Sequence, residues 1–208
     1  MNHLYYAQEV AMFMQRLYRQ KLTTSLGGNI SLKADNTIFI TPSQMDKDRL
    51  TADDIIEMDL TGNVIKASNP ISMESKMHLS VYTVRSDVKA VIHAHAFWAS
   101  LFALSDLEPL TDISDEAYYT IKRLAECKYQ TMGTSDLAAE VAEKIKNADV
   151  LILQNHGVLT CGNTLVEALE RLEVINNMAH YAYLANPSIH LKSISPEAKK
   201  RIDSMNGK

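Results

Sequence analysis

The chain has 208 residues, of which 46% are hydrophobic and 22% are charged, and its formal net charge is −4. This length suits one domain with a sizeable core, and the acidic balance argues against nucleic acid or an anionic membrane surface as partner. The first residues lack the features of a signal peptide, no apolar run approaches the ~18 residues of a membrane span, and the two cysteines match no metal or redox spacing, so we expect a cytoplasmic protein with free thiols.

The N-terminal half predicts one long helix followed by paired strands. Apolar residues recur at helical spacing over residues 3–21, and two glycines follow the end of this segment. Thr51 and the acidic residues after it indicate a helix start, and Ser72 is placed to begin a helix that runs to about Arg85. Short β-like segments joined by polar turns predict two hairpins, with strands at 29–33, 37–40, 55–60 and 64–66.

The C-terminal half alternates strongly apolar strands with helices. The expected strands cover residues 88–95 and 149–155. The expected helices lie near 113–126, 134–147 and 164–185, with a short final helix from Ser195, where proline occupies the first helical position. Interspersed helices and hairpins favour an α/β fold with a mixed or antiparallel sheet covered by helices, as one domain.

Two histidines, His93 and His95, end the apolar segment 88–95. Residues i and i+2 of a strand project from the same face, about 6.6–6.8 Å apart along the chain. Both rings can therefore converge on one metal ion at about 2.0–2.1 Å. A pair of hydrogen-bonded histidines at a sheet end is the alternative interpretation of the same pattern.

A third histidine and a glutamate complete a candidate set of four ligands. His156 follows the second apolar strand and precedes Gly157, which we expect to let the backbone turn sharply. Glu74 lies just past Ser72, where it would otherwise only complement a helix dipole. Three imidazole nitrogens and one carboxylate favour zinc, with cobalt or manganese as alternatives. If substrate oxygens displace Glu74, it becomes a general base beside a Lewis acid.

Small and hydroxyl-bearing residues in three loops suggest an anion site. Residues 27–29 allow close backbone approach, residues 41–43 supply hydroxyls at a strand end, and Ser72 offers a hydroxyl and N–H groups at a helix N-terminus. Each feature also occurs as an ordinary turn or cap. The anion site therefore depends on these loops lying beside the candidate metal ligands.

The order of these motifs resembles the class II aldolase/adducin family. The matching segments are Gly-Gly-Asn-Ile-Ser at 27–31, Thr-Pro-Ser at 41–43, Ser-Met-Glu at 72–74, His-Ala-His at 93–95 and Asn-His-Gly-Val at 155–158. The resemblance covers nearly the whole chain. It implies a three-layer α/β/α fold with a mixed, largely antiparallel central sheet, a single domain over residues 1–208, and assembly into a homo-oligomer, as a tetramer.

The resemblance also implies a ligand set and a reaction. His93, His95 and His156 would bind one zinc ion per subunit, with Glu74 completing the shell and acting as the catalytic acid/base. The reaction implied is cleavage of a short ketose 1-phosphate, of the fuculose-1-phosphate type, to dihydroxyacetone phosphate and an aldehyde through a metal-stabilised enediolate. His78, one helical turn after Glu74, resembles a supporting position and not a ligand. The residues that would hold the substrate phosphate are Gly28, Asn29, Ser43, Gln44 and Ser72.

Several positions depart from the aldolase pattern. Leu26 and Met73 stand where hydroxyl side chains are favoured, and Gln44 stands where glycine is favoured. The anion bound is therefore open between a phosphate and a carboxylate. An ungapped count puts the family's proton-donor tyrosine at Ser114, and the nearest tyrosines are Tyr118 and Tyr119.

These departures leave other functions open. A metal-dependent decarboxylase of a sugar-acid phosphate and a pentulose-phosphate 4-epimerase would both use the same metal residues. A glutamate at position 74 favours an aldolase or a related lyase over the epimerase branch. A non-catalytic, adducin-like module is the third alternative, and the complete set of four ligands argues against it.

Overall fold

The computed structural model describes residues 2–185 and 189–205. In this part of the chain an eight-stranded sheet has the order β4-β3-β2-β1-β5-β8-β7-β6. Every neighbouring pair is antiparallel except β6 and β7, which are parallel. The mixed, largely antiparallel sheet is confirmed. Its strands are β1 (Asn29–Ala34), β2 (Thr37–Ile40), β3 (Ile56–Asp59), β4 (Val64–Lys66), β5 (Ala90–Ala94), β6 (Leu124–Cys127), β7 (Val150–Leu153) and β8 (Gly157–Gly162).

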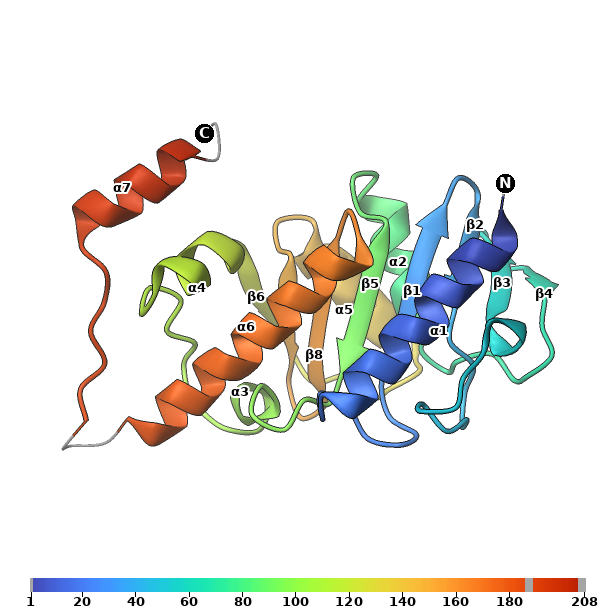
Figure 1. Cartoon of the computed structure of the whole chain (residues 1–208), viewed down its shortest axis with the longest axis horizontal. Helices are drawn as coiled ribbons and strands as arrows, with labels where there is room; N and C mark the ends of the chain where they lie inside the picture. Colours follow the sequence, from blue (N-terminus) through green and yellow to red (C-terminus); the bar gives the residue numbers. More distant parts are fainter. Residues whose placement is uncertain (1, 186–188, 206–208) are drawn as a thin grey trace.

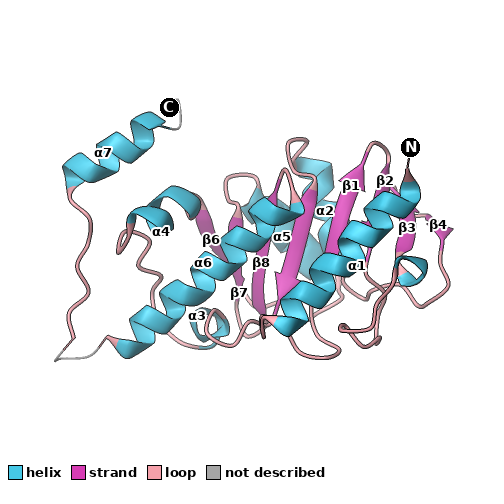
Figure 2. Cartoon of the chain, viewed as in Figure 1, coloured by secondary structure: helices cyan, strands magenta, loops and turns pink. Residues whose placement is uncertain are grey.

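Helices cover both faces of the sheet. In Figure 1, α1 (His3–Arg19) and α6 (Leu165–Leu184) lie in front of it, and α2 (Ser75–Val84) and α5 (Ser135–Ile145) lie behind it. Figure 2 shows the resulting layers of helix, strand and helix, so the expected three-layer α/β/α architecture is confirmed. The short elements are η1 (Ala52–Asp54), α3 (Ser100–Leu104), α4 (Asp115–Thr120) and α7 (Pro196–Met205).

Apolar side chains fill two cores, one on each face of the sheet. Adjacent residues of β5 divide between them: Ile92 packs with α1 and α6, whereas Val91 packs with α2 and α5. A strand buried on both faces reads as a continuous apolar run and not as an alternating one. This is why residues 88–95 could be recognised as a buried strand.

Two expectations about the C-terminal half were wrong or incomplete. The helix predicted near 113–126 ends at Thr120, and its last third is strand β6, which pairs in parallel with β7 through Leu124 and Val150. This pairing between distant segments overrides the local helical pattern. Strand β8 was not predicted, because it follows β7 after only three residues and looked like the loop carrying His156.

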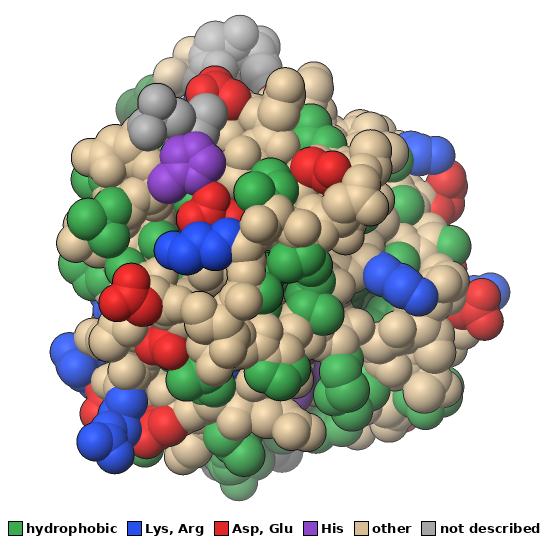
Figure 3. Space-filling view, turned by 90° about the vertical axis from the view of Figure 1, so that its right-hand side faces the viewer, with side chains coloured by type: hydrophobic (Ala, Val, Ile, Leu, Met, Phe, Trp, Pro, Cys, Tyr) green, Lys and Arg blue, Asp and Glu red, His purple; other side chains and the backbone are tan. Residues whose placement is uncertain are grey.

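The surface carries charges of both signs. Figure 3 views the end of the molecule with β4 and the N-terminus, where basic and acidic side chains are interspersed among hydrophobic and polar ones. No helix within the described residues has both the length and the apolar character that crossing a bilayer would require.

Candidate metal centre

Three segments of the chain bring the four predicted ligands to one end of the sheet. His93 is in β5 and His95 directly follows it, while His156 lies in the three-residue turn between β7 and β8. Because β5 and β8 are antiparallel neighbours, with Ala94 opposite Val158, this turn lies beside the end of β5. Glu74 is the N-cap residue of α2, on the adjacent helical layer.

The four side chains converge. The Nε2 atoms of His93 and His95 are 3.0 Å apart, so the two rings share a face of the strand as predicted. Glu74 Oε2 lies 3.2 Å from His93 Nε2, and Glu74 Oε1 lies 3.3 Å from His156 Nε2. One ligand atom from each histidine falls within 4.8 Å of the others. These separations are compatible with one ion at their centre.

The hydrogen bonds around the cluster suit a cation. His93 Nδ1 donates to the carbonyl oxygen of Val158 at 3.0 Å, which leaves the Nε2 lone pair directed at the other ligands. Glu74 Oε1 and His156 Nδ1 are buried and have no hydrogen-bond partner among the described residues. A buried carboxylate oxygen without a donor is costly, and a bound cation removes that cost. The residues present therefore fit a divalent metal ion of the zinc type.

Burial sets the protonation states that such an ion needs. Burial lowers the pKa of His93 to about 3 and also lowers the pKa of His95, which keeps both rings neutral and able to coordinate. For Glu74, burial favours the neutral acid, but the neighbouring His93 and the hydrogen bond from Asn29 act in the opposite direction. The resulting pKa of Glu74 is below its usual value, so the side chain is a carboxylate.

A buried hydrogen-bond chain holds Glu74 from behind. Asn29 Nδ2 donates to Glu74 Oε2 at 2.8 Å, and Asn29 Oδ1 accepts from His78 Nε2 at 2.5 Å. His78 Nδ1 is then an acceptor for the hydroxyl of Ser31 at 2.7 Å, and Ser31 Oγ lies 2.7 Å from the hydroxyl of Tyr82. His78 thus lies behind Glu74 and outside the histidine cluster. Burial lowers the pKa of His78 to about 4, which keeps its ring neutral in this chain.

A cavity of about 270 Å³ opens beside the cluster. The five residues expected to hold the substrate phosphate line it, together with the histidines His95 and His156. Thr41, whose hydroxyl was also expected to contribute, is instead buried and accepts from the backbone N–H of Ile30. Ser72 was expected to cap α2, but the helix begins later, and Ser72 Oγ instead accepts from the backbone N–H of Glu74 at 3.3 Å. The predicted anion residues in the cavity are Gly28, Asn29, Ser43, Gln44 and Ser72.

Two glycines and one glutamine shape the backbone around this cavity. Gly28 has a φ of +67°, and a Cβ there would lie 2.9 Å from the carbonyl oxygen of His93, so only glycine fits. The expectation that Gly157 makes the sharp turn was wrong: the left-handed residue of that turn is Asn155, with φ 56°. Gly157 is needed because a Cβ would lie 2.7 Å from the carbonyl oxygen of Ala94. Gln44 adopts a φ of 54°, a conformation that glycine takes without strain.

The candidate proton-donor tyrosines lie elsewhere. Tyr118 is on α4 and donates its hydroxyl proton to Asp203 of α7 at 3.1 Å. Ser114 is the N-cap of α4 and accepts from the backbone N–H of Ala117. Neither Tyr118 nor Tyr119 lines the cavity beside the histidines.

Lys47 also lines this cavity, and nothing in the sequence singled it out. It lies in an irregular loop after β2 with no periodic pattern around it. The only available signal was its closeness in sequence to Ser43 and Gln44.

Comparisons with known proteins agree with the geometry. The family described as "Class II Aldolase and Adducin N-terminal domain" matches residues 8–183. An L-fuculose phosphate aldolase of Methanococcus maripaludis is 36% identical over 170 residues, covering 82% of this chain and 92% of that protein. A 3-oxo-tetronate 4-phosphate decarboxylase of Haemophilus influenzae is 27% identical, covering 78% of this chain and 79% of that protein. A solved L-fuculose 1-phosphate aldolase structure superposes with a TM-score of 0.88 at 28% identity, covering 100% of both chains.

Proposed function

The chain belongs to the class II aldolase and adducin family as one of its enzymes, and from this premise we propose that it is a zinc-dependent aldolase. Its substrate would be a short ketose 1-phosphate, cleaved to dihydroxyacetone phosphate and an aldehyde. Zinc would be held by His93, His95, His156 and, in the absence of substrate, Glu74. The observation that carries the proposal is Glu74 Oε1, which is buried beside His156 without a hydrogen-bond donor and next to a cavity with anion-binding loops.

The metal ion, Glu74 and the residues that line the cavity would have separate roles in this reaction. When bound, the divalent ion would act as a Lewis acid that stabilises negative charge on the substrate oxygens. Asn29 fixes one oxygen of Glu74, so the other oxygen is the one free to carry a proton to and from the substrate carbon. Gly28, Ser43 and Ser72, with Asn29 and Gln44, would hold the phosphate end of the substrate in the cavity.

A decarboxylase of a sugar-acid phosphate is the second candidate. It is supported by the similarity to the Haemophilus influenzae decarboxylase and by the missing hydroxyls at Leu26 and Met73. The same metal ligands and the same base would serve that reaction. Carbon dioxide release from a 3-oxo acid phosphate, without exchange into dihydroxyacetone phosphate, would favour it. Interconversion of pentulose phosphates would instead favour the 4-epimerase.

The test is proton exchange at the hydroxymethyl carbon of dihydroxyacetone phosphate in deuterium oxide, followed by NMR. Zinc-loaded wild-type protein should catalyse stereospecific exchange, because the base and the Lewis acid act on this half of the substrate alone. Glu74→Gln should lose about 10²- to 10⁴-fold of the rate, the usual contribution of a positioned general base. Glu143→Gln, which changes an exposed carboxylate paired with Lys146, is the matched control.

Three results would contradict all or part of the proposal. Absence of exchange in protein with full zinc occupancy would exclude the aldolase and leave the decarboxylase or epimerase. A wild-type protein that binds no zinc in stoichiometric amount would favour a non-catalytic, adducin-like module. Exchange that survives in Glu74→Gln would keep the aldolase but move the base to another residue.

We also propose that the chain works as a homotetramer. The mouth of the cavity carries large apolar side chains that are more than half exposed, namely Leu26, Met73 and Met132. Such a group at a site rim is typical of a surface that another chain covers. Light scattering on the eluted protein should give the mass of four chains, and a monomer mass at micromolar concentration would refute it.

A further inference from the structure

One buried cation beside the candidate site has no counter-ion. Lys47 is 1% exposed and lines the same cavity as Ser43 and Ser72. Its ammonium donates to the carbonyl oxygen of Pro42 at 3.1 Å and makes no ion pair with any described residue. The backbone N–H of Lys47 is fixed by the carbonyl oxygen of Ser25 at 3.0 Å, so the start of the side chain is held in place.

A buried ammonium without a counter-ion destabilises the fold unless a bound anion pairs with it. An ammonium group has three donors, and here one of them is used. Burying an ion without a partner costs several kcal/mol. Burial lowers the pKa of Lys47 to about 8, so the group remains mostly protonated at neutral pH. Arg85, which is also buried, differs from Lys47 in that it is paired with both Asp87 and Asp149.

The cavity also lacks part of what an anion site of this family would contain. Leu26 and Met73 supply no hydroxyl, and Gln44 is bulkier than glycine. A cation in the same cavity would replace those missing donors, because one charge-assisted hydrogen bond is about twice as strong as a neutral one.

We propose that Lys47 forms the ion pair with the oxyanion of the substrate and so selects anionic over neutral substrates. This inference rests on the proposed function, since it concerns the anionic end of the same substrate. The chemistry required is an oxyanion, supplied by either a phosphate or a carboxylate group. Lys47 takes no part in bond cleavage and sets which substrates bind.

The test measures the affinity of the zinc-loaded full chain for inorganic phosphate by calorimetry. Lys47→Met keeps the length and removes the charge, and it should weaken phosphate binding about 10- to 100-fold. In phosphate-free buffer its thermal midpoint should equal or exceed that of wild type, because an unpaired buried charge is gone. Lys146→Met, which removes an exposed lysine paired with Glu143, should change neither quantity.

A second variant separates the charge from the contact with Pro42. Lys47→Gln keeps a neutral donor, so it should fold even if loss of the Pro42 contact prevents Lys47→Met from folding, and it should still bind phosphate weakly. Phosphate binding within twofold of wild type in either folded variant would overturn the inference. If acetate, and not phosphate, binds in a manner that depends on Lys47, the pairing role is supported and the anion is a carboxylate.

The exchange assay distinguishes a failure of this inference from a failure of the proposed function. If wild type exchanges dihydroxyacetone phosphate and Lys47→Met does so with an unchanged KM, the inference fails and the function stands. If wild type gives no exchange but binds phosphate through Lys47, the function fails and the inference stands. A raised KM with kcat nearly unchanged supports both.

Discussion

Two carboxylates, Glu74 and Asp149, are buried at opposite ends of helix α2 and strand β7. Glu74 precedes α2, and Arg85, which pairs with Asp149, directly follows it. Asp149 precedes β7, and His156 lies beyond the other end of that strand. The two side chains are almost equally buried, with residue exposures of 8% for Glu74 and 7% for Asp149. Burial alone therefore does not distinguish their roles.

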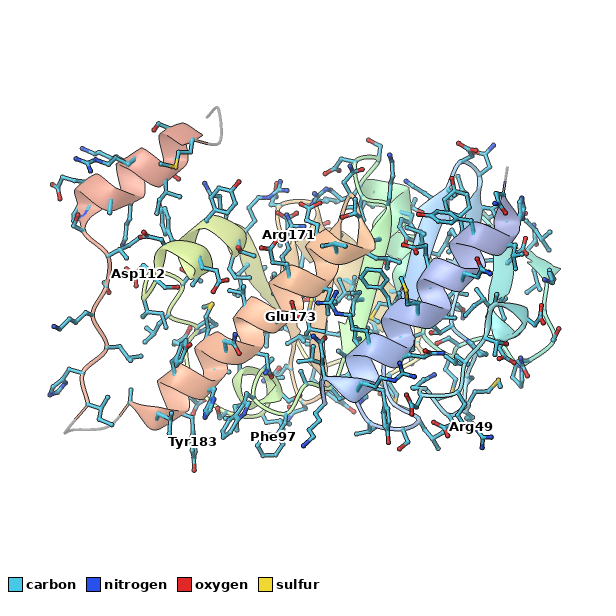
Figure 4. All side chains as sticks on the ribbon, in the orientation of Figure 1. Arg49, Phe97, Asp112, Arg171, Glu173 and Tyr183 are labelled. Carbon is cyan, nitrogen blue, oxygen red and sulfur yellow. The ribbon has the colours of Figure 1, made fainter. Side chains whose placement is uncertain are left out.

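Their hydrogen bonds differ completely. Asp149 Oδ1 accepts from Arg85 and Arg123, and Oδ2 accepts from Arg123. Arg171, which Figure 4 labels on α6, lies 3.8 Å from Asp149 Oδ2. Glu74 has one donor on Oε2 and none on Oε1. A carboxylate whose oxygens are both occupied by fixed cations holds the fold together. A carboxylate with an open oxygen beside three histidines is available to a ligand.

The largest expected effect on stability comes from removing the charge of Asp149, whose two oxygens both accept from arginines. Asp149→Asn leaves Asp87 as the one anionic partner of the buried Arg85 guanidinium among the described residues, and we expect a loss of about 3–5 kcal/mol in the free energy of unfolding. Urea unfolding of the metal-free protein measures this loss. Zinc stoichiometry should be unchanged, since the metal residues lie at the other ends of α2 and β7. A loss below about 1 kcal/mol would show that this ion cluster does not stabilise the fold in the way proposed.

Acid should lower the free energy of unfolding in part through protonation of His78, which lies behind Glu74. The pKa of His78 is about 4 in the fold, against about 6.5 when unfolded, so the unfolded chain binds the extra proton first. The contribution of His78 to stability is therefore complete above about pH 6.5 and is lost as the pH falls toward 4, with roughly 2 kcal/mol lost by pH 5. His93 and His95, whose pKa values are also lowered, add to the loss in the same direction, so the difference between wild type and a His78 variant isolates the share of His78. Urea unfolding of metal-free protein across this range measures the slope. His78→Gln should have a shallower slope, and an equal slope would contradict the assignment.

The smallest effect on stability should come from changing Glu74, whose Oε1 atom has no hydrogen-bond donor among the described residues. Glu74→Gln keeps an oxygen for Asn29 and removes a partly unpartnered buried charge, so the metal-free protein should stay within about 1 kcal/mol of wild type. Its affinity for zinc, measured by competition with a chelator, should fall at least tenfold because a ligand is lost. A loss of stability as large as that of Asp149→Asn would mean that Glu74 is mainly structural.

The sequence predicted the parts of the site that depend on regular structure. His93 and His95 could be placed on one face because a buried strand has a two-residue period and an unbroken apolar pattern. The fold class followed from the alternation of strands and helices. Strand β6 was missed because its pairing with β7 depends on a partner more than twenty residues away, which no local pattern reveals.

The parts that were missed depend on three-dimensional packing. Nothing local to Lys47 indicates that its ammonium is buried in a loop without a counter-ion. The hydrogen-bond chain through Ser31 and Tyr82 joins β1 to α2, and only the packing of α2 against the sheet brings these residues together. The role of Gly157 was assigned to its backbone angle, whereas it comes from the close approach of β5.

The strand order has a consequence for how the protein folds. Strands β1 to β4 pair in sequence, and β7 pairs with β8 through a short turn, so these two parts of the sheet can form from local contacts. The three candidate metal-binding histidines lie at the end of the central strands, where β5 pairs with β1 and β8, its distant partners in the sequence. Pairings between distant segments form slowly, because the entropy of loop closure is lost before the contacts that offset it have formed. We therefore expect the ligands to meet only when both halves have docked, so a bound ion would bind the native state selectively and slow proteolysis through the unfolded chain.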